Sequence, residues 1–146
     1  MAIYTYKNST EWLGEHKGHV KMENGVELDF SAPPSMHGLP NVLTPEDLFM
    51  AAVNTCYFMM FIWACERFKI NLVSVTIEAI GKVVENIDKT SIFTEVLLKM
   101  KIKAKDTTEE RIKSAIKSAR KYSLVAESIK AELKIEPEIE ICRGDL

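Results

Sequence analysis

Short runs of alternating apolar and polar side chains predict β-strands in the first forty residues. Residues 20–22 and 26–30 each alternate in this way, and a period of two is typical of a strand with one buried face. Asn24 and Gly25 separate the two runs, and this dipeptide is the strongest short-range signal for a hairpin turn. An additional first strand is expected at residues 3–7.

A loop rich in proline and glycine, residues 32–42, leads to a long helix that is expected over residues 44–68. Thr44 is a good N-cap, and Pro45 suits the first helical position. The two residues that follow are acidic, and their charge is favourable at the positive end of the helix dipole. The pattern therefore predicts a well-defined helix start.

Residues 48–65 of this helix are apolar on every face, so the helix must be buried on every side. A membrane span, which needs roughly 18 such residues, is one alternative. The acidic flank, Asn54 in the middle of the segment and the soluble pattern of the strands argue against it. Two small sheets can hardly wrap the whole helix, so we expect a second copy of the helix alongside it, in an intertwined homodimer.

The second half of the chain predicts three strands and one helix. The helix has a capping-box pattern at Thr107 and Glu110. Pro137 interrupts the last strand and favours an edge position or a bulge. The strands are expected at residues 73–79, 92–103 and 133–141, and the helix at residues 108–122.

The predicted order is β-β-β-α-β-β-α-β, which is an α+β fold. The chain of 146 residues is expected to form a single domain. Its parts would be the N-terminal strands and loop (1–43), the central helix (44–68) and a β-β-α-β segment (71–146).

Composition excludes several function classes. The net charge is −2, whereas a nucleic-acid-binding protein would show a basic footprint. The first seven residues lack the basic and apolar regions of a signal peptide. Three scattered cysteines do not make a disulfide framework, so a cytoplasmic location is expected. His16 and His19 would point to opposite faces of a strand, and we expect neither a metal nor a cofactor.

Four lysines alternate along the predicted strand at residues 92–103 and just beyond it: Lys99, Lys101, Lys103 and Lys105. A basic binding patch is one interpretation. The alternative is a solvated face whose lysines pair across strands with the glutamates of the last strand.

Cys56 is the candidate reactive group. Taken alone, a cysteine in an apolar helix is more often inert packing than a nucleophile. Cys56 lies twelve residues past the predicted N-cap, so the helix dipole cannot activate it. Cys65 falls on the opposite face of the helix, and neither Cys65 nor Cys142 is expected to react.

Two segments resemble the OsmC/Ohr family of osmotically inducible and organic hydroperoxide resistance proteins. Pro45-Glu46-Asp47-Leu48-Phe49, followed by Ala51-Ala52 and Cys56, is similar to the helix that carries the family's peroxidatic cysteine, with its glutamate ten residues earlier. Lys121-Tyr122-Ser123-Leu124-Val125 resembles the family's second segment. The predicted element order matches too, and the resemblance covers nearly the whole chain.

The departures from the family pattern bear on mechanism. The family's resolving cysteine falls at Ser123, and a serine cannot form the disulfide that closes the catalytic cycle. The family's arginine, which binds the glutamate, falls near His16, with Lys17 as the alternative. Neither offers the forked double donor of arginine. A straight helix separates Glu46 from Cys56 by ~15 Å, so a kink, a bridging cation or the partner subunit would have to link them.

The resemblance implies two functions. The first is a one-cysteine thiol peroxidase in oxidative-stress defence, with Cys56 as nucleophile, Glu46 and His16 or Lys17 as orienting groups, and an external thiol as reductant. The second is a non-enzymatic protein that binds a small apolar or thiol-bearing ligand on the same fold. The expected partners are a second copy of the chain and a small molecule, without nucleic acid or membrane.

Overall fold

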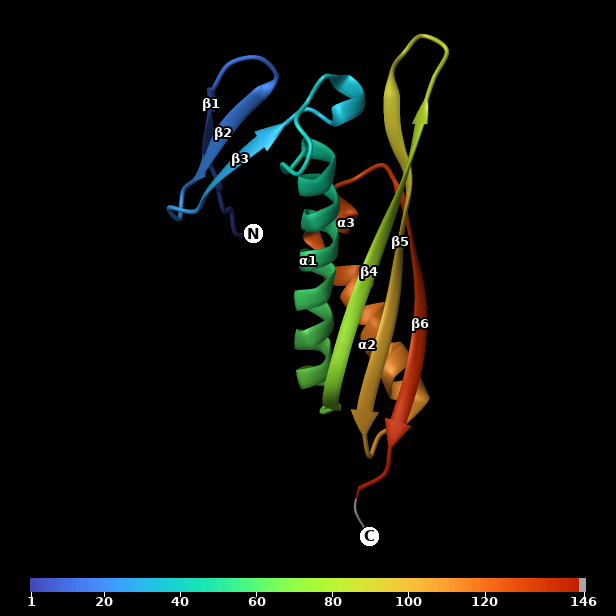
Figure 1. Cartoon of the computed structure of the whole chain (residues 1–146). Helices are drawn as coiled ribbons and strands as arrows, with labels where there is room; N and C mark the ends of the chain where they lie inside the picture. The colour runs from blue at the N-terminus through green and yellow to red at the C-terminus, as the bar shows by residue number, and fades with distance from the viewer. Residues whose placement is uncertain (145–146) are drawn as a thin grey trace. The chain divides into compact units, whose positions relative to one another are not determined.

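In the computed structural model, which describes residues 1–144, the chain forms two compact units, Met1–Phe49 and Met50–Leu146. The element order is β1-β2-β3-η1-α1-β4-β5-α2-α3-β6 (Figure 1). This is the predicted α+β order with two short helices added, η1 and α3. The single-domain prediction for residues 1–146 stays a prediction, and its last two positions lie outside the described residues.

The first unit contains a three-stranded antiparallel sheet in the order β1-β2-β3. The hairpin between β2 and β3 turns at Asn24-Gly25, as predicted. There the Met22 amide donates to the Val26 carbonyl at 2.8 Å, and Gly25 adopts a φ of 93°. Glycine reaches that left-handed conformation without steric cost. The strands are β1 (Asn8–Trp12), β2 (Lys17–Met22) and β3 (Glu27–Ser31).

The strand expected at residues 3–7 is wrong, because β1 begins at Asn8 and residues 3–7 have no regular structure. The register gives the reason. Asn8 pairs with Met22, the last residue of β2 before the hairpin turn. Residues before Asn8 therefore have no β2 backbone left to pair with, whatever their β-propensity.

The predicted loop contains one turn of 3-10 helix, η1 (Pro34–Met36). The buried Ser31 hydroxyl holds the loop closed. It accepts the Leu39 amide at 2.7 Å and donates to the Ala32 carbonyl at 2.8 Å. Gly38 passes so close to Ala32 that a Cβ at this position would overlap its carbonyl. Tight local bonding thus fixes the path of the chain toward the central helix.

The central helix α1 (Pro45–Arg67) begins and ends within a residue of its predicted bounds. Thr44 is its N-cap residue, as predicted. The Thr44 hydroxyl accepts the Asp47 amide at 3.1 Å, and the Asp47 carboxylate accepts the Thr44 amide at 3.1 Å. This reciprocal pair satisfies two amides that would otherwise lack partners at the helix start.

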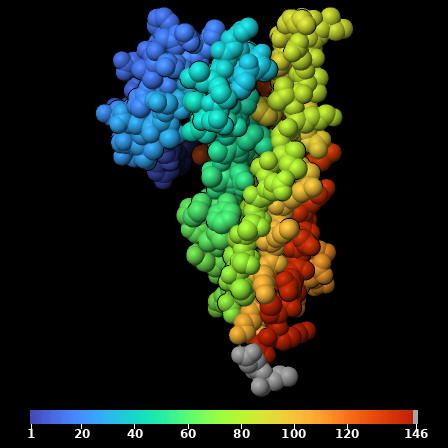
Figure 2. All heavy atoms as spheres, viewed as in Figure 1, coloured from blue at the N-terminus to red at the C-terminus, as the bar shows by residue number. Residues whose placement is uncertain are grey.

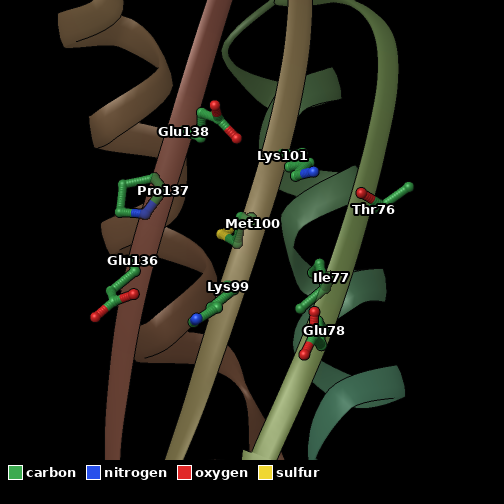
Figure 3. Close-up of a pocket in the computed structure, with 9 residues that line it drawn as sticks. All are labelled: Thr76, Ile77, Glu78, Lys99, Met100, Lys101, Glu136, Pro137 and Glu138. Atoms are coloured by element: carbon green, nitrogen blue, oxygen red, sulfur yellow. The ribbon is translucent and has the colours of Figure 1, made fainter.

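The second unit consists of a three-stranded sheet and helices that cover one of its faces (Figures 1 and 3). β4 and β5 form a long antiparallel hairpin, and β6 lies parallel to β5 at the sheet edge. The elements are β4 (Asn71–Glu85), β5 (Ser91–Lys105), α2 (Glu109–Tyr122), α3 (Leu124–Glu127) and β6 (Glu132–Cys142).

The core of this unit lies between the sheet and the helices. One face of β5 is buried, and so is one stripe each of α1 and α2. Burial of these apolar side chains stabilises the unit through the hydrophobic effect. Asn54, in the middle of α1, donates to the Ile77 carbonyl of β4 at 3.1 Å. The buried residues are Val96, Leu98, Met100, Ile102 and Ala104 of β5, Val53, Tyr57, Phe61, Ala64 and Cys65 of α1, and Ile112, Ala115 and Ala119 of α2.

The structure tests two predictions about the second half of the chain, the cap of its helix and the position of Pro137. The N-cap of α2 is Thr108, whose side chain accepts the Arg111 amide at 3.3 Å. The predicted capping box at Thr107 and Glu110 is therefore one residue too early. Thr107 fits the capping-box pattern with Glu110, whereas Thr108 has Arg111 three residues later, yet Thr108 is the residue with the hydrogen-bonded N-cap geometry. Pro137 lies in β6, whose register with β5 is unbroken, so the edge position is confirmed.

Candidate functional site

Cys56 and Ser123 meet in the second unit. The Ser123 Oγ lies 3.5 Å from the Cys56 Sγ and donates a hydrogen bond to it, although the two residues are 67 positions apart in the sequence. Cys56 lies in α1, whereas Ser123 lies at the junction of α2 and α3. The contact therefore depends on the packing of α1 against the second helical segment.

Ser123 is fully buried, with 0% of its surface exposed. It ends α2 and starts α3, with extended backbone angles (φ −77°, ψ 102°). A serine at an N-cap usually caps the helix with its hydroxyl. Within residues 1–144, the Ser123 side chain makes no such bond to α3. Its hydroxyl points to the Cys56 sulfur instead.

The helix turn that carries Cys56 is anchored on its inner side. Tyr57 is completely buried and donates from its hydroxyl to the Ile116 carbonyl of α2 at 3.2 Å. Burial raises the pKa of Tyr57, so this phenol stays a neutral donor. Cys56 itself is half-buried. The helix turn that carries the thiol is thus held in place, and Cys56 as a residue remains partly exposed.

The other two cysteines lie in different surroundings. All three cysteines are free thiols. Cys65 is buried on the inner stripe of α1, and this burial, with a smaller contribution from the neighbouring Glu66, raises the pKa of its thiol to about 11. A thiol with so high a pKa is almost entirely protonated at neutral pH, and the thiolate is the nucleophile. Cys142 is half-buried at the end of β6.

The remaining predicted site residues, Glu46 and His16, belong to the first unit. The Glu46 Oε2 is shielded from solvent and has no hydrogen-bond partner among residues 1–144. The ring of His16 lies 6.0 Å from the ring of His37, centroid to centroid. Among the described residues, no hydrogen bond or ion pair joins Glu46 to His16 or to Lys17.

His37 is a neighbour of His16 that the sequence did not predict. It caps η1 with a left-handed backbone (φ 67°) inside the long loop. No periodicity links positions 16 and 37, so only the folded path of the loop reveals the pair. In the part of the chain that the structure describes, no group of three or more His, Cys, Asp or Glu side chains could hold a metal ion.

The lysines of β5 lie on the sheet face opposite the helices, and two of them, Lys99 and Lys101, line a shallow pocket of about 510 Å³ (Figure 3). The register places Lys99 between Glu78 and Glu136, and it places Lys101 beside Glu138. Opposite charges thus lie opposite one another in the register, although no ion pair joins these lysines to the glutamates among the described residues. This pocket contains neither Cys56 nor Ser123.

Comparisons with known proteins agree on the fold. A family model described as "OsmC-like protein" matches residues 38–138. A search of curated proteins finds no match. Among solved structures, an OsmC-like protein of unknown function from Vibrio cholerae has a TM-score of 0.83 at 17% identity, covering 93% of this chain and 100% of its own.

Two further structures carry functional names. An organic hydroperoxide resistance protein from Elizabethkingia anophelis has a TM-score of 0.75 at 21% identity and covers 97% of this chain and 99% of its own. An organic hydroperoxide resistance protein OsmC from Legionella pneumophila has a TM-score of 0.72 at 18% identity, with coverages of 96% and 99%. At these identities the likeness shows the fold.

Proposed function

Because this chain belongs to the OsmC-like protein family, we propose that it is a one-cysteine thiol peroxidase that reduces organic hydroperoxides. The observation that carries the proposal is the contact between Cys56 and Ser123 at 3.5 Å. It brings together the two sequence segments that resemble the family's two cysteine segments. That meeting supports the assignment of Cys56 to the position of the peroxidatic cysteine.

The proposed first half-reaction takes place at the Cys56 sulfur. The thiolate attacks one oxygen of the hydroperoxide, the O–O bond breaks, and the second oxygen leaves as an alcohol after it takes up a proton. Cys56 is oxidised to a sulfenic acid, and the hydroperoxide is reduced. The half-buried position of the thiol in α1 supports a nucleophile that small molecules can reach.

The proposed second half-reaction requires an external thiol, because Ser123 cannot supply a second sulfur. One thiol attacks the sulfenic sulfur, which forms a mixed disulfide and releases water. A second thiol then attacks the mixed disulfide, which releases an external disulfide and restores Cys56. A reducing cytoplasm would supply such thiols, and the three free cysteines are compatible with that location.

Glu46 and His16 are proposed to orient the reacting groups. The unpartnered Oε2 of Glu46 supports this role, because a shielded carboxylate oxygen without a partner is costly unless a donor arrives. His16 would provide that donor, with Lys17 as the alternative. Neither offers two parallel N–H groups as arginine does, so this part of the mechanism would be weaker than in the family pattern.

We further propose that the working form is a homodimer formed around α1. Side chains of α1 form part of the surface of the single chain (Figure 2). Only 28% of an apolar 18-residue stretch of this helix is buried. Met59 is 45% exposed and Trp63 is 54% exposed. Among the described residues, α1 is the one helix that is long enough and apolar enough to cross a bilayer. Asn54 in the middle of the helix and the acidic first turn favour a second chain over a bilayer as the cover.

Peroxide turnover tests the proposal. Purified protein with cumene hydroperoxide and dithiothreitol should consume the hydroperoxide, and Cys56→Ser should reduce the rate to that of the uncatalysed reaction. Cys142→Ser is the matched control and should retain the rate. If the folded protein with reduced Cys56 is no faster than Cys56→Ser, the peroxidase proposal is wrong.

That outcome would favour the second candidate, a binding protein for a small apolar or thiol-bearing ligand. The specific observation behind it is Ser123, which removes the resolving sulfur from the place where it would be needed. Ligand protection of Cys56 from alkylation, without hydroperoxide consumption, would support this candidate.

A further inference from the structure

The Ser123 hydroxyl has an unusual environment for a serine at a helix start. It is fully buried, so water cannot satisfy it. Within residues 1–144 it makes no capping hydrogen bond to α3, and it lies 3.5 Å from the Cys56 sulfur instead. A buried hydroxyl is costly when it has no partner. The sulfur of Cys56 is therefore the partner on which the hydroxyl depends.

The same contact gives the Cys56 sulfur a hydrogen-bond donor. Its place in the middle of α1 is too far from the helix start for the dipole to act on it. Among the described residues, Ser123 is the side chain that is hydrogen-bonded to the Cys56 sulfur. A hydrogen bond donated to an ionisable group favours its charged form when that form is the better acceptor. A thiolate is a much better acceptor than a thiol.

We propose that Ser123 is a hydrogen-bond donor that stabilises the Cys56 thiolate, so that a serine at the position of a second cysteine activates the first. The hydroxyl keeps its proton and only shares it, so no group is oxidised or reduced in this step. A donor of this kind suits a one-cysteine site, because it assists the attack of Cys56 and leaves resolution to another thiol. Its catalytic value rests on the proposed function, but its effect on the thiolate does not.

The pH dependence of Cys56 alkylation tests the proposal without any peroxide. Iodoacetamide is applied to the folded protein over a range of pH, and the labelled Cys56 peptide is quantified by mass spectrometry. The variants are Ser123→Ala, Ser123→Thr and Ser123→Val. Threonine keeps the hydroxyl, whereas valine has nearly the same shape without it. Ser128→Ala is the matched control, because that hydroxyl donates to the Leu124 carbonyl at 2.7 Å, away from the sulfur.

Loss of the donor should lower the thiolate fraction at pH 7. We expect Ser123→Ala and Ser123→Val to slow alkylation of Cys56 at this pH by about three- to tenfold, the effect of losing one hydrogen bond to the sulfur. Ser123→Thr and Ser128→Ala should stay within about twofold of the wild type. At a pH high enough to ionise the thiol in every variant, the variants without the hydroxyl should be no slower than the wild type.

Loss of the rate decrease at high pH distinguishes stabilisation of the thiolate from a change in access. A variant that only opens or closes the path to Cys56 would change the rate by the same factor at every pH. That result, or equal rates for the threonine and valine variants, would overturn the proposal. Because alkylation requires no hydroperoxide, the outcome is independent of whether the protein proves to be a peroxidase.

Discussion

Ser123 Oγ and Cys56 Sγ are 3.5 Å apart across the contact between α1 and the junction of α2 and α3. A disulfide requires an S–S distance of about 2.05 Å and closely spaced backbones. A longer C–S bond in place of the C–O bond of Ser123 would bring two sulfurs within the range that a small side-chain rotation can close. The position is therefore prepared for a disulfide that the natural residue cannot form.

We predict that Ser123→Cys forms an intramolecular disulfide with Cys56 when the folded protein is treated with an organic hydroperoxide. Mass spectrometry should show a peptide pair joined by the bond, and the oxidised variant should be more stable than the reduced one by about 2–4 kcal/mol. Wild-type protein should form no intramolecular bridge, and its Cys56 should stop at the sulfenic or sulfinic stage.

The double variant His16→Arg with Ser123→Cys is the sharper form of this test, because it also restores the forked donor. Faster hydroperoxide consumption than with Ser123→Cys alone would support the placement of His16 at the family's arginine position. If the folded double variant forms no bridge to Cys56, the alignment of the second segment is wrong, and the binding-protein candidate becomes the stronger one.

The start of α2 offers a test of the corrected cap. Thr108 accepts the Arg111 amide, whereas the shielded hydroxyl of Thr107 has no partner within residues 1–144. Thr108→Ala should lower the free energy of unfolding by about 1 kcal/mol, and Thr107→Ala should change it little or raise it slightly. Urea denaturation of both variants measures the difference, and the reverse order of effects would restore Thr107 as the cap.

These features divide into those that local sequence predicts and those that it does not. The cap at Thr44 and the turn at Asn24-Gly25 depend on a few neighbouring residues, so the sequence predicts both correctly. The start of β1 at Asn8 depends on where β2 ends, which is a property of strand register. A local propensity at residues 3–7 carries no information about that register, and the predicted strand there failed for this reason.

The candidate site also contains contacts that local sequence does not predict, because its residues are far apart in the chain. Cys56 and Ser123 were chosen from two segments that resemble a family, and no periodicity in the chain predicts that they touch. The pairing of His16 with His37 depends on the path of a loop held by backbone and hydroxyl bonds. Contacts between residues far apart in sequence become visible only when the fold is known.

The exposed stripe of α1 leads to a prediction about assembly. Met59 and Trp63 lie one turn apart on α1, and both are exposed in the single chain. If a second chain covers them, Trp63→Glu should bury an unpaired charge in the interface and shift the protein from dimer to monomer. Sedimentation velocity at micromolar concentration measures the change, and the tryptophan emission of the wild type should shift to the red on dilution.

Ile87→Glu is the matched control for this experiment. Ile87 is also apolar and fully exposed, but it lies in the turn between β4 and β5 rather than on α1. It should leave the sedimentation coefficient unchanged. A wild-type protein that sediments as a stable folded monomer would contradict the proposed dimer.

A histidine in the first unit predicts a dependence of stability on pH. His19 of β2 lies between two carboxylates of β3, with Nδ1 2.6 Å from Asp29 Oδ1 and Nε2 3.0 Å from Glu27 Oε1. Glu11 of β1 is opposite His19 on the other neighbouring strand. The hydrogen bond to Asp29, followed by that to Glu27, raises the pKa of His19 above its usual 6.5. The bond from His19 also lowers the pKa of Glu27.

Because the folded-state pKa of His19 is raised, its stabilising contribution is fully present below the unfolded pKa of about 6.5. That contribution is lost as the pH rises through the higher folded-state pKa. Asp29→Asn removes the carboxylate that raises the pKa of His19 most, so it should destabilise the protein near pH 6 and have less effect near pH 9. Urea denaturation at the two pH values measures the difference, and an NMR titration of the His19 ring should show a lower midpoint in the variant.

Glu23→Gln is the control for this last experiment, because Glu23 lies in the hairpin turn beside the same sheet. It should leave the His19 midpoint close to that of the wild type. The surroundings of His19 are partly open to solvent, so the effect on stability should weaken as salt is added. An Asp29→Asn effect that is equal at pH 6 and pH 9 would mean that Asp29 acts through strand packing rather than through the charge of His19.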